Sequence, residues 1–207
     1  MRYSARTLAK PLDKSERRLQ ILQNAREVFA KHGYHAAKID DIVAAAGIAR
    51  GTFYSYFEDK RAIFGEIVDQ TFARIGASIV RVDTDDPHRS VGEQVRENIR
   101  AIVHALLEDR ATTKILLSDA VGLDPELDRK LMSFYEAIGQ LLESSLLDGQ
   151  ERGIVAPGDV RMFSIMSLGA MKEIMYQVTM RDLNYPEDRI VEEVYNFLCQ
   201  GYLRSAR

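Results

Sequence analysis

The sequence predicts an all-α protein of about nine helices, and three observations support this fold class. Apolar residues recur three and four positions apart along most of the 207 residues, which is the period of an amphipathic helix. No segment shows the regular alternation of apolar and polar residues that marks a half-buried strand. Glycine or proline stands between the periodic segments, where helices end and begin. The single cysteine excludes an internal disulfide, and the length is sufficient for a core without one.

The first four expected helices lie between residues 14 and 80. Gly33 follows the first of them and can supply a left-handed C-cap. Asp40 and Asp41 fall in the first turn of the second, where carboxylates complement the positive end of the helix dipole. Gly47 ends that helix, because glycine accepts the positive φ of a tight turn. The four helices are expected at residues 14–31, 39–46, 49–57 and 59–80.

The remaining helices follow a break at residues 83–87, where Asp-Thr-Asp-Asp-Pro predicts a loop. Asp124 and Pro125 have the form of a helix cap followed by proline at the first helical position, and Gly153 ends the helix that they open. Proline also opens each of the last two helices. The five helices are expected at residues 91–108, 111–121, 125–152, 157–180 and 185–204.

Charge is unevenly distributed along the chain. Residues 1–61 carry 12 Lys/Arg against 7 Asp/Glu, and residues 62–207 carry 16 against 24. A basic N-terminal segment on an acidic body indicates that only the first part meets a polyanion. Chance clustering of charge is the alternative reading. We therefore expect an N-terminal domain at residues 1–61 and a larger domain at residues 62–207.

The segment from Lys38 to Phe57 has the features of a helix-turn-helix. Gly47 forms the tight turn between the two helices. Phe53 and Phe57 lie four residues apart, so they share one face and can anchor the second helix to the core. A short polar helix held from behind in this way can be offered to the major groove of DNA. The face opposite the aromatic rings carries Arg50, Thr52, Ser55 and Tyr56.

The same segment resembles the TetR family of bacterial transcriptional regulators. The resemblance rests on the run GIARGTFYSYF at residues 47–57 with EDK at 58–60, and on the phrases AKHGY at 30–34 and IDDI at 39–42. It covers residues 15–64, with many positions in fixed register. The rest of the chain fits the family only in length and in its all-helical pattern. The fold expected is therefore a helix-turn-helix head on a helical body that binds a ligand and dimerises.

The resemblance implies DNA contacts at individual residues. Those that match phosphate-binding positions are Tyr54, Tyr56 and Lys60. Those that match positions able to reach bases are Arg50, Gly51 and Ser55, and Thr52 matches a position close to the DNA backbone or a base edge. An arginine can pair bidentately with guanine, which contributes about 1–3 kcal/mol of discrimination, so Arg50 is the expected base reader. A lysine at position 60 would give salt-dependent affinity without sequence preference.

Two positions depart from the family pattern. Lys38 stands where the family usually has Ser or Thr, so the side-chain oxygen that caps the helix at 39–46 is missing. We expect Lys38 to contact a DNA phosphate instead. Ala49 replaces a frequent Ser at the start of the recognition helix. Neither change breaks the fold, but both alter details of DNA contact. Tyr54 also has an alternative role in packing, since a buried tyrosine needs only one polar partner.

The last two helices are expected to form a homodimer interface. A helix-turn-helix protein of this class places two recognition helices in successive major grooves, about 34 Å apart or more, and therefore needs two copies. The helix at 162–180 is apolar nearly all round, which is typical of a helix buried on both sides. The family resemblance implies the same pairing, as a four-helix bundle. The alternative is that both helices are buried within one subunit.

The resemblance also implies a ligand cavity between the middle helices. Its lining would be almost entirely apolar, so the expected ligand is a hydrophobic or amphipathic small molecule. His104 interrupts an apolar helix and could donate a hydrogen bond to such a ligand, although histidines are often found at the surface. The expected lining residues are Phe72, Ile99, Val103, His104, Leu107, Phe134, Ile138, Met171, Met175 and Tyr176.

The sequence offers little to other functions. It contains neither a P-loop nor a dinucleotide-binding glycine motif, and no nucleophile–base pair can be assembled, so we expect no enzyme. No metal site or cofactor is expected, because no third ligand accompanies His32 and His35. A helical interaction or scaffold protein without DNA binding remains the alternative. Because no signal-like or membrane-spanning apolar run is present, we expect a cytoplasmic protein without a membrane partner.

These observations predict a repressor whose dimer holds a palindromic operator. The ligand would shift the helix at 59–80, which belongs to both parts of the chain, and release the DNA. Such a ligand acts only through a differential affinity for the two states.

Overall fold

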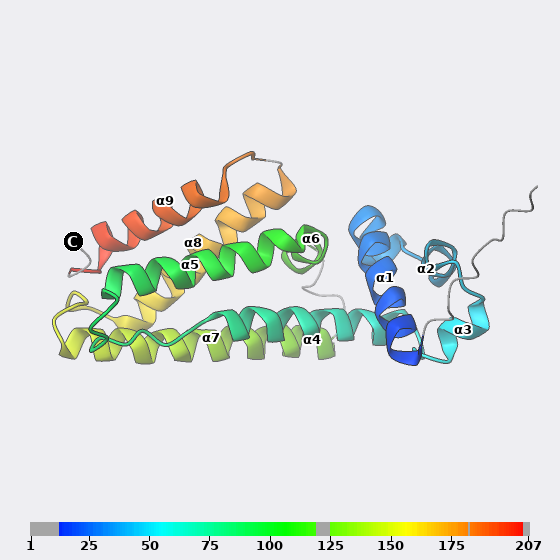
Figure 1. Ribbon diagram of the computed structural model, residues 1–207, viewed down its shortest axis with the longest axis horizontal. Helices are drawn as coiled ribbons and strands as arrows, with labels where there is room; N and C mark the ends of the chain where they lie inside the picture. Colours follow the sequence, from blue (N-terminus) through cyan, green and yellow to red (C-terminus); the bar gives the residue numbers. More distant parts are fainter. Residues whose placement is uncertain (1–12, 119–124, 182, 205–207) are drawn as a thin grey trace, which may run out of the picture. The chain divides into compact units, whose positions relative to one another are not determined.

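The computed structural model describes residues 13–118, 125–181 and 183–204, and confirms the predicted all-α fold (Figure 1). Among these residues the only β structure is one isolated bridge, between Val155 and Leu203. The expected helix end near Val121 and Gly122, and the expected cap at Asp124, lie outside the described residues. The described helices are α1 (Lys14–Ala36), α2 (Ile39–Ala46), α3 (Arg50–Tyr54), α4 (Lys60–Ser78), α5 (Val91–Glu108), α6 (Arg110–Ser118), α7 (Pro125–Glu151), α8 (Val160–Met180) and α9 (Glu187–Gly201).

The chain divides into two compact units, residues 1–64 and residues 65–207. The first unit holds α1, α2, α3 and the first residues of α4, and the second holds the rest of α4 and α5 to α9. The domain boundary predicted from the sequence, at residue 61, lies within the first turn of α4. One helix is thus common to both units.

Side-chain caps fix where two of the helices begin. Asp13 accepts the backbone N–H of Glu16 at 2.8 Å, and the Glu16 carboxylate accepts the N–H of Asp13 at 2.9 Å. Ser90 and Glu93 form the same reciprocal pair at the start of α5. Each pair satisfies two N–H groups that the first turn of a helix leaves without an intrahelical partner.

Several helix ends differ from the sequence expectation, those of α1 and α9 among them. α1 does not stop at residue 31: it is interrupted at Gly33, with φ of 75°, and then continues to Ala36. α9 ends at Gly201, because the chain then pairs with the connection between α7 and α8. Ala156 donates to the Tyr202 carbonyl at 2.7 Å, and Arg204 donates to the Ile154 carbonyl at 2.7 Å. The spacing of apolar residues cannot predict this pairing, because the two segments lie about fifty residues apart in the chain.

The core of the first unit is built on aromatic rings. Phe29 of α1, Ile42 of α2 and Phe53 of α3 are completely buried. The Phe64 ring meets Phe29 edge-on, with centroids 5.5 Å apart. Edge-to-face packing is a favoured arrangement of two rings, so the start of α4 is fixed to α1.

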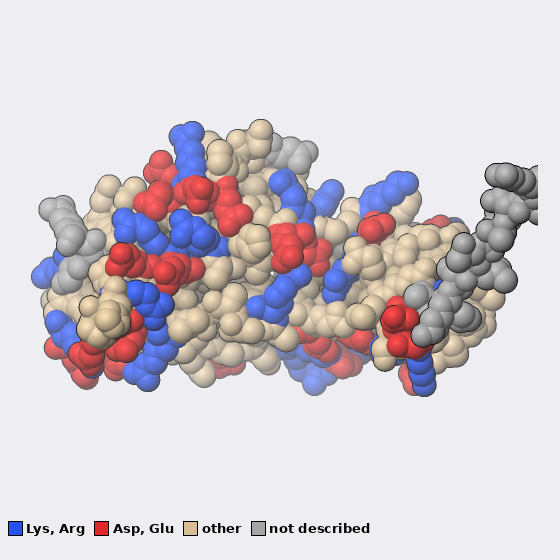
Figure 2. Space-filling view, in the orientation of Figure 1, with Lys and Arg blue, Asp and Glu red and all other residues tan. Residues whose placement is uncertain are grey.

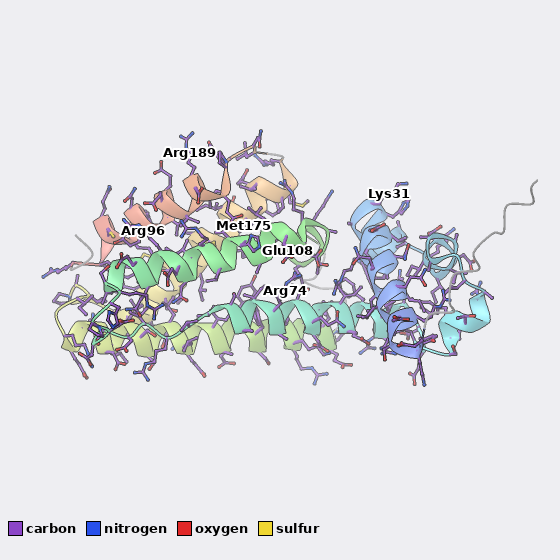
Figure 3. All side chains as sticks on the ribbon, viewed as in Figure 1. Lys31, Arg74, Arg96, Glu108, Met175 and Arg189 are labelled. Carbon is purple, nitrogen blue, oxygen red and sulfur yellow. The ribbon has the colours of Figure 1, made fainter. Side chains whose placement is uncertain are left out.

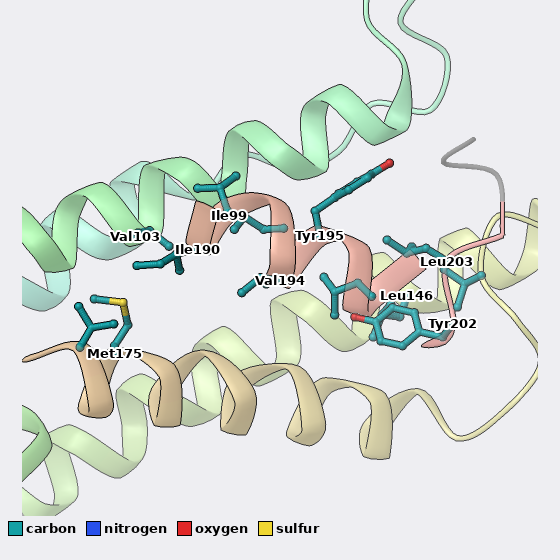
Figure 4. Packing of buried hydrophobic residues seen from close by; sticks show 13 residues of the cluster. Ile99, Val103, Leu146, Met175, Ile190, Val194, Tyr195, Tyr202 and Leu203 are labelled. Atoms are coloured by element: carbon teal, nitrogen blue, oxygen red, sulfur yellow. The ribbon is translucent and has the colours of Figure 1, made fainter. Parts of the chain in front are cut away.

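The core of the second unit lies between α5, α8 and α9 (Figure 4). Val103 from α5, Met175 from α8 and Val191 from α9 are fully buried in it. The outer surface of α5 and α9 carries interleaved opposite charges (Figure 2), including the Arg96–Glu192 pair at 3.2 Å. α5 and α9 therefore bury one face against the core and expose the other to solvent.

Candidate DNA interface and ligand cavity

The turn between α2 and α3 depends on Gly47. Its φ of 62° and ψ of 37° are left-handed, a conformation in which other residues are strained. Its N–H donates to the Ala44 carbonyl at 3.2 Å, and the N–H of Ile48 donates to the Val43 carbonyl at 3.2 Å. These bonds end α2 and direct the chain into α3.

The back of α3 is held by two aromatic rings, as the sequence predicts. Phe53 and Phe57 are buried, with ring centroids 5.8 Å apart. α3 itself ends at Tyr54, three residues before the expected end, and the hydroxyl of Ser55 donates to the Thr52 carbonyl at 2.7 Å. The N–H of Phe57 still donates to the Phe53 carbonyl at 3.0 Å, so one helical turn connects the two rings.

The other face of α3 carries the predicted DNA-contacting residues. Arg50, Gly51, Tyr54 and Ser55 are exposed, and Thr52 and Tyr56 are half-buried. Arg50 Nη1 donates to Asp40 Oδ1 at 2.8 Å, and Arg50 Nη2 donates to Tyr54 Oη at 3.4 Å. The hydrogen bond with Tyr54, together with the charge of Asp40, raises the pKa of the Arg50 guanidinium. Two neighbouring side chains therefore hold the Arg50 guanidinium in place on the exposed face of α3.

Lys38 begins α2 without a side-chain cap, as its residue type predicts. The Asp41 carboxylate instead accepts the backbone N–H of Lys38 at 2.9 Å. The Lys38 side chain is exposed. Its expected phosphate contact stays a prediction.

Lys60 has a structural role that the sequence did not indicate. Its Nζ donates to the carbonyls of Tyr34 at 2.7 Å, His35 at 3.2 Å and Ala37 at 3.0 Å, and lies 4.5 Å from the centre of the Tyr34 ring. Partial burial lowers the pKa of the Lys60 ammonium. Lys60 thus ties the start of α4 to the end of α1. A phosphate contact by the same group stays a prediction.

We predict that Lys60→Ala destabilises the first unit by about 1–3 kcal/mol, because three carbonyls lose a charged donor. Thermal unfolding measures this loss, and Lys60→Arg serves as the charge-retaining control. If Lys60 contacted only DNA, the alanine variant would unfold at the wild-type temperature and show only a weaker salt dependence of binding.

A contact that the sequence does not predict stabilises the turn after α3. Arg18 Nη1 donates to the Tyr56 carbonyl at 2.9 Å, and its guanidinium lies 4.3 Å from the centre of the Phe57 ring. The two residues are 38 positions apart, and no local pattern marks their contact. α1 therefore supports the recognition segment through a polar and an aromatic contact together.

The second unit contains a cavity of about 590 Å³. Residues from α4 to α9 line it, and the rings of Phe72 and Phe134 stack across α4 and α7 with centroids 3.9 Å apart. Figure 3 places Met175 between α5 and α8. The predicted residues that line the cavity are Phe72, Ile99, Phe134, Ile138, Met171 and Met175.

Four other predicted lining residues lie elsewhere. Val103 is fully buried in the core cluster, with Leu107 packed against that cluster. His104 is exposed, with Nδ1 3.4 Å from the Glu187 carboxylate. Tyr176 is half-buried outside the cavity lining. Helical register explains why Val103 and Leu107 do not line the cavity. Ile99, Ile102 and Leu106 of α5 face it, and the next residue along a helix is rotated by about 100° about the helix axis.

Several polar groups in the cavity wall already have partners within the chain. The Asn98 amide bonds to the backbone N–H of Val80 at 2.9 Å and to its carbonyl at 2.6 Å. Thr113 donates to the Leu106 carbonyl at 2.7 Å, and Ser167 and Tyr202 share a hydrogen bond of 2.7 Å between their hydroxyls. The interior therefore favours an apolar group, which needs no hydrogen-bond partner.

Comparisons with known proteins agree with this architecture. The profile described as bacterial regulatory proteins of the tetR family matches residues 21–67, and the one described as the tetracyclin repressor-like C-terminal domain matches residues 88–176. An HTH-type transcriptional regulator of Bacillus subtilis (strain 168), YdgC, is 30% identical over 190 residues, which cover 91% of this chain and 93% of the relative. The chain belongs to the TetR family.

Two further similarities concern regulators of Bacillus subtilis. The fatty acid metabolism regulator protein of Bacillus subtilis (strain 168) is 25% identical over 88% of this chain and 94% of its own. The structure of FadR from Bacillus subtilis in complex with stearoyl-CoA is 26% identical, with a TM-score of 0.71 over 88% of this chain and 98% of that one. The chain is thus a DNA-binding transcriptional regulator, and its relatives are regulators, not enzymes.

Two features are absent from the described residues. No helix among them is long and apolar enough to cross a membrane. In the same part of the chain, no three His, Cys, Asp or Glu side chains come together as a metal site would require.

Proposed function

We propose that this chain is a dimeric repressor that binds a palindromic operator through α2 and α3 and is released by an amphipathic small molecule. The observation that carries the DNA-binding part is the pair of buried rings, Phe53 and Phe57, beneath an exposed face with a charged Arg50. A helix fixed from behind in this way can enter the major groove without deforming. Because the target is bacterial DNA, we place the protein in the cytoplasm.

Each part of the DNA-binding residue set has a proposed role. Arg50 reads bases, with Gly51, Thr52 and Ser55 close to the base edges or the backbone. Tyr54, Tyr56, Lys38 and Lys60 contact phosphates, which position the protein on DNA. The DNA-binding domain is residues 1–61, and residues 62–207 bind the ligand and dimerise.

The proposed ligand carries a long apolar chain of the fatty acyl kind. A volume of about 590 Å³ is in the range of small-molecule sites, and several polar groups of the wall already have partners within the chain. The complex of the Bacillus subtilis relative with stearoyl-CoA supports the same class of ligand for this chain. The six predicted lining residues from Phe72 to Met175 would contact the apolar chain.

Release of DNA would follow from a movement of α4. Phe72 and Ile75 of α4 line the cavity, and Lys60 and Ile63 of the same helix pack in the first unit. A ligand that favours one position of α4 would change the spacing of the two recognition helices of the dimer. A gel-shift assay on DNA upstream of the protein's own gene, with and without stearoyl-CoA, tests this function. A helical scaffold protein would shift no DNA under either condition.

We predict that Arg50→Ala lowers discrimination between operator and mutated operator about 5- to 150-fold, since a bidentate arginine contributes about 1–3 kcal/mol. Asp40→Asn should have a smaller effect in the same direction, because Asp40 only holds Arg50. Fluorescence anisotropy on both DNAs measures the ratio, with Glu58→Gln as a matched loss of an exposed carboxylate. If Arg50→Ala selected the same motif as the wild type from random DNA, base recognition by Arg50 would be contradicted.

We predict that Ile138→Trp abolishes the response to stearoyl-CoA while operator binding without ligand is retained, because the larger ring fills the cavity. Leu147→Trp is the control: it lies on the same helix, is exposed, and does not line the cavity. Anisotropy titrations with and without stearoyl-CoA measure the response. A full response in the Ile138 variant would place the ligand elsewhere.

A further inference from the structure

A second cavity of about 490 Å³ adjoins the first. It lies between the loop that follows α4, the end of α7, the connection to α8 and the end of α9, where Figure 4 shows Leu146, Tyr202 and Leu203. The two cavities have wall residues in common, so they lie side by side, and we call them the first and the second chamber. The common residues are Arg81, Val82, Val95, Leu142, Ser145, Leu198 and Tyr202.

The two chambers differ in chemistry. The first is mostly apolar in its interior, whereas the second is lined by five charged side chains. Arg81 lies in the wall of both chambers, at their junction. An amphipathic molecule could therefore place its tail in the first chamber and its head in the second. The charged residues of the second chamber are Arg81, Asp83, Asp85, Asp148 and Arg152.

Both arginines of the second chamber are held by exposed ion pairs. Arg81 pairs with Asp148, and Arg152 Nη1 lies 2.9 Å from Asp85 Oδ1. Exposed pairs of this kind contribute little to stability, because water competes for both partners. An incoming anion can take the place of Asp148 at Arg81, and the displaced carboxylate remains in solvent. The exchange leaves no charge buried without a partner.

The charge balance sets a condition on this exchange. Three carboxylates line the chamber against two guanidinium groups, so it has no surplus of positive charge. An anion gains from the chamber only by displacing a carboxylate from its arginine. Removing Asp148 should therefore strengthen anion binding, and removing Arg81 should weaken it.

We propose that the second chamber binds the anionic head group of the ligand, a carboxylate or a phosphate, and that Arg81 is its principal partner. Arg152 lies further from the junction and assists. This inference rests on the proposed function, since it needs a ligand tail in the first chamber. It adds where the anionic head of that ligand lies, toward the end of α7, and which side chain binds it.

Three probes with the same 12-carbon chain test the head-group site: laurate, lauroyl-CoA and 1-dodecanol, each titrated calorimetrically into the full chain. Laurate and lauroyl-CoA separate a carboxylate head from a phosphate head, and loss of either anion in Arg81→Gln supports the site. We expect Arg81→Gln to lower the affinity for at least one of the two anions about 10-fold, as the loss of a charged hydrogen bond does. The affinity for dodecanol should change less than about twofold. Asp148→Asn should bind the same anion more tightly.

The controls separate the possible failures. Lys172→Gln removes a cation that lines only the first chamber, and it should leave all three affinities unchanged. The inference is overturned if Arg81→Gln weakens dodecanol as much as the anions, if Asp148→Asn weakens the anions, or if the loss appears in Lys172→Gln instead. Failure of all three probes to bind the wild-type chain would reject the proposed ligand class and the head-group site with it. Thermal unfolding of each variant identifies a general loss of structure.

Discussion

Phe53→Ala is expected to abolish operator binding while ligand binding by the second unit continues. Phe53 is completely buried, with the ring of Phe57 5.8 Å away and that of Tyr54 5.5 Å away, edge-on. Truncating a buried phenylalanine costs about 3–5 kcal/mol. Whole domains are stable by only about 5–15 kcal/mol, and small ones lie at the low end, so the first unit would be largely unfolded or loosened.

Two measurements distinguish this effect from a lost DNA contact. Anisotropy should show no specific binding at any salt concentration, and thermal unfolding should show an early transition while ligand affinity stays at the wild-type value. Leu19→Ala is the control, because Leu19 is an exposed apolar residue of α1 in the same unit. An operator affinity within a few-fold of wild type for Phe53→Ala would contradict the anchoring role of this ring.

The helix-turn-helix could be predicted because its determinants are local. The positive φ of Gly47 follows from its residue type, and the four-residue spacing of Phe53 and Phe57 predicts a shared face. Lys60 could not be interpreted in the same way, because its carbonyl partners lie 23 to 26 residues away. Its three hydrogen bonds appear only once α1 and α4 have packed.

The cavity was predicted less completely for a related reason. Periodicity shows that one side of α5 is apolar, but not which part of that side faces the core and which the cavity. Val103 and Ile102 are adjacent, yet the first is in the core cluster and the second lines the cavity. The charged residues of the second chamber could not be predicted from the spacing of apolar residues, because that spacing selects apolar positions only. Arg81 is in a loop, and its position beside Asp148 depends on contacts across 67 residues.

Met166→Glu is expected to convert the dimer to monomers and to lower operator affinity on the order of 100-fold, because two linked binding modules reinforce each other by such factors. Met162, Ile165 and Met166 of α8 are 50%, 54% and 47% exposed in the single chain. They lie on one side of the helix at spacings of three and four, and together with the exposed Gly169 they form an apolar stripe. These three side chains are thus only partly buried within one subunit, whereas Met175 and Val178 of the same helix are buried in the core. An exposed apolar stripe of this kind is typical of an interface, so we propose that it forms the dimer contact.

A glutamate at position 166 would be buried in the proposed interface, where a two-fold axis brings the same patch of each subunit together. Burying a carboxylate without a partner is costly, so the monomer becomes the stable form. Light scattering at micromolar concentration measures the mass, and anisotropy measures the loss of operator affinity. Met132→Glu is the matched control, with the same change at a methionine of α7 that is 71% exposed. A dimer that persisted in Met166→Glu would show that the two copies meet on another face, and the apolar stripe of α8 would then need a different partner.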